Sequence, residues 1–463
     1  MLIFLNALVK PLWVLTENAV QNAVGHEDWG TYTAMFSFAF LFITLSDMGI
    51  NQYSTKTLAS QPQLLKSYFP NLLSAKILLN MAYPLIIVAL GHWVMGFTQR
   101  ELYFLFLLCL VHGGNQFVQF FRANFQAMQE FRIDGFASVV DKVVLLLLVW
   151  ALFYVGLDIE SFIYARVGTT LLTIVLFYIV ISRLYGWLAP RFDARLVGRI
   201  LRASFSFGLI TILYSIHDKV DQVMLKELAN EVETSLYAAA YRWMDAFSMY
   251  LWLVLTMFFA RFAYHIKDPG EQSELLRAGQ IVTALPLIFV CVFVFFYGEQ
   301  LLWQQTNSSA VQLHIMSLSL KILFVAMCIN ALFMVYSTLL TSTGYVVFVN
   351  WLIVGAILVN IVLNFWLIPQ YGALAAAFST AVSLAIAGLA YVVYTHLRLP
   401  VQVPFLLLGK IVLAGLGLAV TFFVLSQTSL SWYINTLLAA ALYGGLCVLL
   451  GLIPKDLLEM LKK

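Results

Sequence analysis

Fourteen segments of this chain are each long and apolar enough to cross a lipid bilayer, yet ionisable side chains lie inside them. A spanning helix needs about 20 mainly apolar residues. Apart from residues near the segment ends, which we assign to the loops, we count six basic and six acidic side chains within these segments: Lys10, Lys142, Arg166, Lys219, Arg242, Lys321, Glu17, Asp47, Asp141, Asp218, Asp221 and Asp245. A charge at the bilayer centre costs roughly 2.5–3.5 kcal/mol, so we expect these groups to face a shared polar cavity. The pattern therefore predicts a transporter.

The composition excludes an ordinary soluble protein. Hydrophobic residues make up 62% of the chain and charged residues only 11%, whereas charged residues are about 25% of a typical soluble domain. The net charge of +3 gives no indication of a nucleic-acid partner. The four cysteines all lie in apolar segments and form no CxxC pair, so neither a disulfide framework nor a metal site is expected. The prediction is an all-α polytopic membrane protein without a cofactor.

Basic residues support the number of spans. The predicted spans cover residues 1–22, 30–53, 72–97, 101–127, 134–156, 158–181, 203–225, 235–263, 276–299, 313–340, 346–368, 371–396, 404–426 and 432–453. Loops rich in Lys and Arg face the cytoplasm. Eighteen basic residues, Lys76 among them, fall on one side of this topology, and only Arg100 and Lys226 fall on the other. We therefore expect both termini in the cytoplasm. A signal peptide is not expected, because no basic region precedes the first span.

An internal repeat divides the spans into two groups. Residues 29–36 resemble residues 234–241, and residues 131–156 followed by a new span parallel residues 347–372. Transporters are often built from such repeated bundles. We predict two six-helix lobes and two additional helices, arranged as an N-lobe over 1–184, a basic cytoplasmic linker over 185–202, a C-lobe over 203–398, and helices 13 and 14 with a tail over 399–463.

Polar residues follow single faces of several spans, because residues three, four or seven apart lie on one side of a helix. The candidate cavity residues are Asn6, Lys10, Trp13 and Glu17 in span 1, Asp47 and Asn51 in span 2, His112, Gln116 and Gln119 in span 4, Arg166 in span 6, Tyr214, His217, Asp218, Lys219 and Asp221 in span 7, Tyr241, Arg242 and Asp245 in span 8, and Lys321 in span 10. Lysine and arginine can neutralise phosphate oxygens, and amides, carboxylates and aromatic faces suit a sugar. The set suits a ligand with an anionic head and a hydroxyl-rich body.

Two alternatives remain open for these charges. Opposite charges such as Lys10 and Glu17, or Arg242 and Asp245, could simply neutralise each other and hold helices together. Arg166 and Lys321 lack an acidic partner on their own helix, so they either bind an anionic ligand or pair with a carboxylate across the bundle, such as Asp47 or Asp218. Asp47, Asp218 and Asp221 are also candidates to carry a coupling H⁺ or Na⁺.

Enzymatic function is not expected. The chain has no GxSxG, HExxH, Walker loop or Gly-rich dinucleotide motif, and its histidines are scattered. Without a phosphate-binding loop, transport would be driven by an ion gradient, the membrane potential or the substrate gradient.

Three segments resemble a known family. They are residues 30–50, which end in Asp-Met-Gly-Ile, residues 218–242, and residues 360–377, in which Pro369 and Gly372 form a tight turn before a run of alanines. In these segments the chain resembles the polysaccharide flippases of the multidrug/oligosaccharidyl-lipid/polysaccharide exporter superfamily.

The resemblance implies a protein of the bacterial inner membrane that moves an undecaprenyl-pyrophosphate-linked oligosaccharide from the cytoplasmic to the periplasmic leaflet by alternating access of two lobes. The product would serve O-antigen, capsule or exopolysaccharide synthesis, with a polysaccharide polymerase as a partner. The additional C-terminal helices also resemble those of lipid II flippases. A cation-coupled multidrug antiporter is a further alternative, but it would have few intramembrane cations. The equal number of intramembrane acids and bases departs from a purely cationic cavity.

Overall fold

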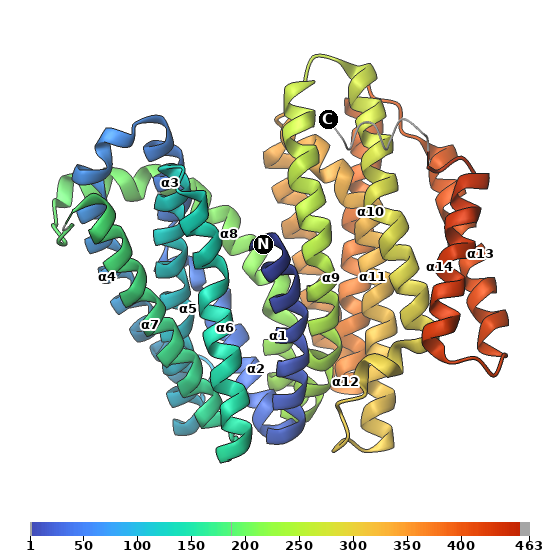
Figure 1. Cartoon of the computed structure of the whole chain (residues 1–463), viewed down its shortest axis with the longest axis horizontal. Coiled ribbons are helices and arrows are strands. Elements are labelled where there is room, and N and C mark those ends of the chain that lie inside the picture. Colours follow the sequence, from blue (N-terminus) through green and yellow to red (C-terminus); the bar gives the residue numbers. More distant parts are fainter. Residues whose placement is uncertain (1, 187, 454–463) are drawn as a thin grey trace. The chain divides into compact units, whose positions relative to one another are not determined.

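The computed structural model is all-helical over the residues that it describes, 2–186 and 188–453. Within these ranges the description leaves out the side chains at positions 2–8, 10, 52, 56, 59, 60, 62, 131, 137, 138, 205–211 and 214. The chain divides into two compact units, Met1–Ser235 and Leu236–Lys463 (Figure 1). The predicted all-α class is confirmed.

Unit 1 contains eight α-helices and two short 3₁₀ turns in its described part. They are α1 (Leu2–Val24), α2 (His26–Leu41), η1 (Ile43–Ser46), α3 (Ile50–Ser60), η2 (Pro62–Leu64), α4 (Leu65–Trp93), α5 (Gln99–Ala127), α6 (Phe131–Val155), α7 (Ile159–Tyr185) and α8 (Ala194–Leu228). The predicted second span is therefore wrong as one continuous helix. It is interrupted between α2 and α3, where Met48 and Gly49 have φ angles of 51° and 80°, in the left-handed region that disfavours helix continuation.

Side-chain caps fix several helix ends in unit 1. Thr98 and Glu101 form a reciprocal capping box at the start of α5, which satisfies two backbone donors that would otherwise be unpaired. At the start of α8, the Asp193 carboxylate accepts hydrogen bonds from the backbone N–H groups of Arg195 and Leu196. Because of this cap the helix begins at Ala194, so the last part of the predicted linker is helical. The assignment of α8 to a second lobe stays a prediction.

Unit 2 contains most of α9 (Glu231–Tyr264), followed by α10 (Pro269–Tyr297), η3 (Gly298–Leu302), α11 (Ala310–Ser342), α12 (Val346–Arg398), α13 (Phe405–Ser426) and α14 (Trp432–Leu449). Two predicted spans fall within α12, which is interrupted at Gly372 by φ and ψ angles of 52° and −127°. Glycine adopts this conformation at little cost because it has no Cβ atom. The predicted turn after Pro369 therefore coincides with a break in the helix.

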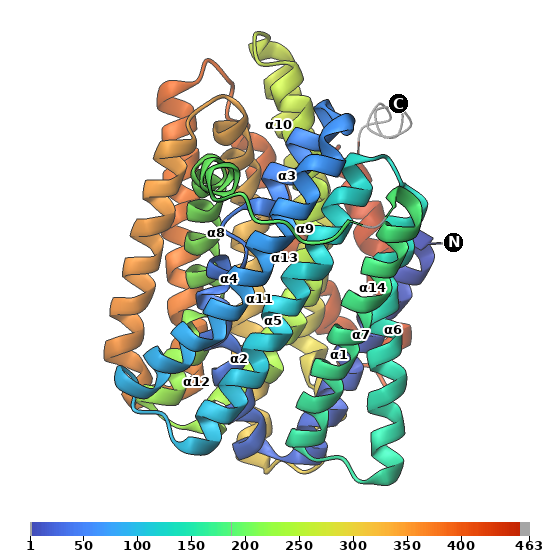
Figure 2. The same cartoon turned by 90° about the vertical axis from the view of Figure 1, so that its left-hand side faces the viewer.

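Each unit has its own core. In unit 1, α4, α5 and α7 lie side by side (Figures 1 and 2), and Phe69, Phe121 and Phe177 are among the buried residues that join them. In unit 2, α13 and α14 pack on α10 through a cluster that includes Ile411 and Phe422. The two additional C-terminal helices therefore belong to unit 2.

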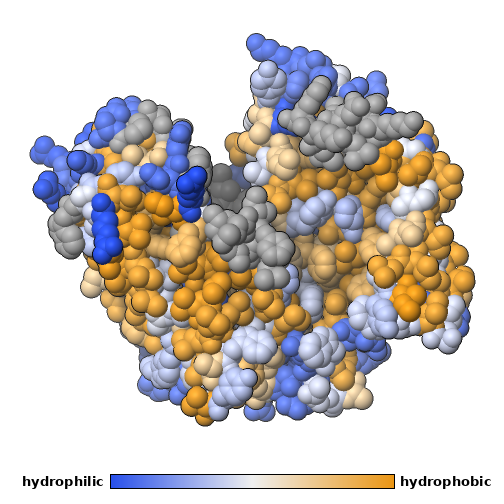
Figure 3. Space-filling model, in the orientation of Figure 1, coloured by the Kyte–Doolittle hydropathy of each residue, from blue (hydrophilic) through white to orange (hydrophobic). Residues whose placement is uncertain are grey.

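The exterior of both units is apolar. Large hydrophobic side chains such as Leu85, Tyr154 and Trp366 are exposed, and Figure 3 shows hydrophobic residues over the middle of each unit with hydrophilic residues near its ends. Ten of the described helices are long and apolar enough to cross a membrane. The α12 helix counts once among them, although it holds two predicted spans. Such a surface would be unfavourable in water but suits contact with acyl chains.

Candidate functional site

A salt bridge within unit 1 joins Arg166 of α7 to Glu17 of α1. The Arg166 Nη1 atom lies 3.8 Å from Glu17 Oε1, and the two side chains are 12% and 17% exposed. Arg166 also donates a hydrogen bond to the hydroxyl group of Tyr32 on α2. Arg166 therefore pairs with a carboxylate across the bundle, which is one of the two predicted alternatives, but this partner is Glu17 and not one of the examples Asp47 and Asp218.

Aromatic rings surround the Arg166 guanidinium group. Its Cζ atom lies 4.8 Å from the ring centroid of Phe36, and 5.6, 5.8 and 6.0 Å from those of Trp13, Phe162 and Tyr32. Contacts of this kind contribute about 0.5–2 kcal/mol each. The Arg166 Nε atom is buried and has no hydrogen-bond partner among the described residues. The Arg166 site thus consists of Trp13, Glu17, Tyr32, Phe36, Phe162 and Arg166, and it offers an unused donor on a partly exposed cation.

Helical periodicity explains how the Arg166 site is assembled. Each of three helices contributes two residues that are four apart, and residues at this spacing share a face. The pairs are Trp13 with Glu17 on α1, Tyr32 with Phe36 on α2, and Phe162 with Arg166 on α7. The spacing was visible in the sequence, but Tyr32, Phe36 and Phe162 are not among the predicted cavity residues. Aromatic residues four positions from a charge were the signal that could have found them.

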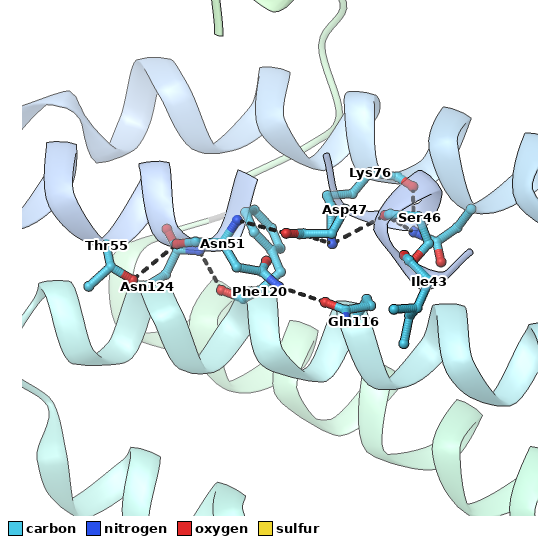
Figure 4. A network of polar contacts seen from close by, with 10 residues as sticks. Ile43, Ser46, Asp47, Asn51, Thr55, Lys76, Gln116, Phe120 and Asn124 are labelled. Carbon is cyan, nitrogen blue, oxygen red and sulfur yellow. Dashed lines mark hydrogen bonds and ion pairs between the residues drawn. The ribbon is translucent and has the colours of Figure 1, made fainter. Parts of the chain in front are cut away.

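A second ion pair lies at the interruption between α2 and α3 (Figure 4). The Lys76 Nζ atom of α4 lies 2.6 Å from Asp47 Oδ1, and the Lys76 side chain is completely buried. Lys76 also lies 3.4 Å from the backbone carbonyl of Ser46, which accepts a further hydrogen bond from the Asn80 amide at 3.1 Å. We call Ser46, Asp47, Lys76 and Asn80 the Lys76 site. Lys76 is not among the predicted cavity residues, because its place near the start of a predicted span assigns it to a cytoplasmic loop, although it lies well inside α4.

The polar network continues from the Lys76 site along α3 and α5. The Asn51 amide donates to Gln116 Oε1 at 3.0 Å (Figure 4), and Ser54 donates to Asn124 at 3.2 Å. The predicted cavity residues Asp47, Asn51 and Gln116 therefore lie together, in contacts between helices. His112 is buried on α5, where its Nε2 atom lies 3.0 Å from the carbonyl oxygen of Phe36.

The polar stripe of α8 lies within unit 1. Lys219 Nζ lies 3.1 Å from Asp218 Oδ2, and the Asp218 side chain is 40% exposed. Asp221 is buried, whereas His217 is half-buried. Gln222, next to Asp221, accepts a hydrogen bond from Ser37 of α2, which connects the stripe to the helix that carries Tyr32 and Phe36.

A further group of polar contacts connects the end of α8 and the start of α9 to the end of α1 and the starts of α2 and α5. Lys226 Nζ lies 2.5 Å from Glu101 Oε1. The Gln21 amide donates to the hydroxyl and carbonyl groups of Ser235, and His26 Nδ1 lies 3.0 Å from that hydroxyl. We call Gln21, His26, Glu101, Lys226 and Ser235 the α5–α8 cluster. Burial lowers the pKa of His26, so the neutral ring is favoured at this position.

Unit 2 holds the remaining described candidates. Tyr241 and Arg242 are buried on α9, and Asp245 is half-buried one turn further along the helix. Tyr241 stacks on Tyr237, with ring centroids 5.4 Å apart. Lys321 of α11 is half-buried, with its Nζ atom 5.6 Å from the ring centroid of Phe295. That these residues share one cavity with those of unit 1 stays a prediction.

Some predicted residues are not part of these groups. The side chains of Asn6, Lys10 and Tyr214 lie outside the described residues, so the predicted pairing of Lys10 with Glu17 stays a prediction. Gln119 is exposed on α5, and Arg122, which follows it on that stripe, forms a salt bridge of 2.6 Å with Asp134 of α6.

Together, the apolar exterior and the buried charges between helices define a multi-pass membrane protein with a polar interior. The sequence model of the family described as polysaccharide biosynthesis proteins matches residues 1–263, which is more than half of the chain. The chain belongs to this family, as the resemblance in its sequence predicted.

Solved structures with a similar fold are membrane transporters. The lipid II flippase MurJ in an inward closed conformation aligns with a TM-score of 0.72 and 13% identity, over 97% of this chain and 98% of that one. An inward-facing multidrug resistance MATE family transporter of the MOP superfamily aligns with a TM-score of 0.69 and 12% identity, over 84% of this chain and 94% of that one. A MOP superfamily transporter from Pyrococcus furiosus, whose binding pocket is described as having reverse polarity, aligns with a TM-score of 0.59 and 12% identity. The alignment covers 86% of this chain and 93% of that one. These likenesses establish the fold. No curated protein sequence matches the chain significantly.

Proposed function

We propose that this protein is a flippase that moves an undecaprenyl-pyrophosphate-linked oligosaccharide from the cytoplasmic to the periplasmic leaflet of a bacterial inner membrane, for surface polysaccharide synthesis. Its membership of the polysaccharide biosynthesis family supports the substrate class. The orientation with both termini in the cytoplasm rests on the one-sided distribution of Lys and Arg. A polysaccharide polymerase is the partner that would use the exported product.

The Arg166 site carries the proposal. A guanidinium group can bind two phosphate oxygens through parallel hydrogen bonds, which suits a pyrophosphate group. At 3.8 Å the Glu17 carboxylate is beyond hydrogen-bond distance of Arg166 Nη1, so an anionic ligand could replace it without breaking a short bond. The Trp13 and Phe36 rings nearby offer flat apolar faces for a sugar.

The same site weighs against the multidrug antiporter. A cationic drug would meet an arginine whose Nε donor is still unused, and like charges in a site of low polarity repel strongly. A lipid II-type flippase remains compatible, since lipid II also presents a pyrophosphate and sugars. The identity of the glycan distinguishes these two substrates. As coupling ions, H⁺ and Na⁺ both remain candidates.

Transport by alternating access would require the α5–α8 cluster to separate. In the predicted arrangement, α5 belongs to the first lobe and α8 to the second. The Glu101–Lys226 pair joins these two helices at the end predicted to face the periplasm. Gly30 of α2 also packs against the backbone of Glu231, where an added Cβ atom would lie 1.8 Å from the carbonyl oxygen. These contacts are consistent with a closed periplasmic end.

Substitution of Arg166 by glutamine tests the proposal. In a strain that lacks the native gene, we expect R166Q to be inserted normally but to export little surface polysaccharide, while the lipid-linked precursor accumulates. Arg100→Gln is the matched control, because Arg100 is 54% exposed and pairs with Asp28 rather than with residues of the Arg166 site. Normal polysaccharide in the R166Q strain would refute the proposed role of the Arg166 site.

A further inference from the structure

The interruption between α2 and α3 leaves backbone carbonyl groups without helical partners inside a membrane protein. A buried carbonyl group that lacks a helical partner requires another donor, because an unpaired buried backbone group is costly. The Ser46 carbonyl receives Lys76 and Asn80 as donors. In transporters, interrupted helices of this kind place unwound carbonyl groups and a carboxylate around a small cation.

The Lys76 ammonium group occupies the position that such a cation would take. Its nitrogen lies 2.6 Å from Asp47 Oδ1 and 3.4 Å from the Ser46 carbonyl oxygen. The ring centroid of Phe117 lies 6.0 Å away, which adds a weak cation–π contact. The Lys76 side chain is completely buried and the Asp47 side chain is 10% exposed, so the ammonium group is almost entirely separated from solvent.

Three further polar side chains lie close to Ser46 and Asp47 in the sequence or bond to them. Thr44 Oγ1, Asn51 Oδ1 and Asn80 Oδ1 are all buried and have no hydrogen-bond partner among the described residues. Thr44 belongs to η1. The backbone N–H of Asn51 donates to Asp47, and the side-chain amide of Asn80 donates to the Ser46 carbonyl. Buried acceptors are normally paired. These oxygen atoms are available as ligands for a cation beside Asp47 if their side chains turn toward it.

We infer that the Lys76 site is a binding site for a small monovalent cation in which the Lys76 ammonium group is the resident cation. With Lys76 in place, Asp47 needs no free ion for charge neutralisation. Without the ammonium group, Asp47, the Ser46 carbonyl and the neighbouring oxygens would bind Na⁺ or Li⁺, with water completing the coordination. This inference does not depend on the proposed flippase function, because it concerns ion binding to the folded chain.

Melting experiments on the purified full-length protein test this inference, with NaCl replaced by choline chloride at constant ionic strength. We expect Lys76→Met to be stabilised by Na⁺, with Tm rising by about 2 °C for each tenfold increase above the dissociation constant. The unsubstituted protein should show no such Na⁺ dependence. The matched control is the double variant Asp47→Asn with Lys76→Met, which lacks both charges and should also be insensitive to Na⁺.

Three outcomes would overturn the inference. The first is that K76M melts at the same temperature in both salts. The second is that K76M shows the same Na⁺ dependence as the double variant or the unsubstituted protein. The third is that K76M fails to fold even in NaCl while the double variant folds, since an empty carboxylate site would then capture no ion. If neither variant folds, Lys76→Gln retains a donor for Asp47, and its Na⁺ dependence decides the question by the same criteria.

Discussion

Unit 1 contains two pairs of a basic and an acidic side chain that differ in the separation and the burial of the charged groups. Lys76 and Asp47 are 2.6 Å apart, and the lysine side chain is completely buried. Arg166 and Glu17 are 3.8 Å apart and both remain partly exposed. A buried pair is held by strong attraction and leaves an uncompensated charge when it is broken, whereas a looser and wetter pair contributes little to stability. The comparison indicates that the first pair supports the structure and that the second is available to a ligand.

The surroundings of the two pairs explain this difference. Lys76 lies beside an interrupted helix, where Ser46 and Asp47 provide oxygen atoms that fix its ammonium group. Arg166 instead lies among aromatic rings. The faces of these rings attract the guanidinium group over a wide range of positions, but they leave its N–H donors available for hydrogen bonds to an anion. The same elementary attraction thus gives a rigid contact in one place and an exchangeable one in the other.

Removal of the carboxylate should separate the two pairs most clearly. We expect Asp47→Ala to lower the free energy of unfolding by about 3–5 kcal/mol, because the Lys76 ammonium group is then buried without a counter-charge. Glu17→Ala should lower it by about 1 kcal/mol or less. Denaturation of the purified variants measures both values. Equal losses would show that burial does not distinguish the two pairs.

Substitution of a glycine near each pair should change the free energy of unfolding by less than removal of the Asp47 carboxylate. An added Cβ atom at Gly113 would lie 2.3 Å from Asn80 Oδ1, whereas at Gly168, on the helix that carries Arg166, it would meet no atom within 4 Å. We expect Gly113→Ala to destabilise the protein by about 1–3 kcal/mol through overpacking. Gly168→Ala should be neutral or stabilising by up to about 1 kcal/mol. A stable G113A variant would mean that the Lys76 region is more adaptable than its contacts indicate.

Neutralisation of Glu17 should make Arg166 more available to an anion. We expect Glu17→Gln to bind inorganic pyrophosphate about tenfold more tightly, which corresponds to about 1.4 kcal/mol. Calorimetric titration of the purified protein measures this change, with the Glu17→Gln/Arg166→Gln double variant as control. Unchanged affinity in the single variant would argue against competition between Glu17 and the ligand.

The hydroxyl of Tyr32 should have the smallest effect. It accepts a hydrogen bond from Arg166, and the loss of one such bond typically costs about 0.5–1.5 kcal/mol. Tyr32→Phe keeps the ring, so we expect pyrophosphate affinity to fall only about two- to tenfold, with folding unchanged. A complete loss of binding would show that the hydroxyl itself contacts the ligand.

The general architecture could be predicted from the sequence, because spans of about 20 apolar residues are unambiguous in a bilayer. The turn at Gly372 was also predictable from Pro369 and the glycine itself. The interruption after Leu41 was not, since only Gly49 indicates it and Met48 adopts a positive φ angle without being a glycine. Lys76 was missed because a lysine near a span end was attributed to insertion topology.

Partners across the bundle were the least predictable feature. Periodicity identifies which residues share a helix face, but the rotation of each helix against its neighbours depends on packing along its whole length. Arg166 could therefore be recognised as a cation that needs a partner, but Glu17 could not be chosen over Asp47 or Asp218. The choice depends on how α1 and α7 face each other, and no motif records that arrangement.

The packing of α13 and α14 has a consequence for how such a chain can gain or lose segments. They contact α10 mainly through apolar side chains, with a few polar links such as the hydrogen bond from Tyr443 to the Leu285 carbonyl. In water, loss of these helices would expose an apolar surface. In a membrane, the acyl chains of lipids can cover that surface at little cost. Terminal helix pairs can thus be added or deleted during evolution without unfolding the remainder.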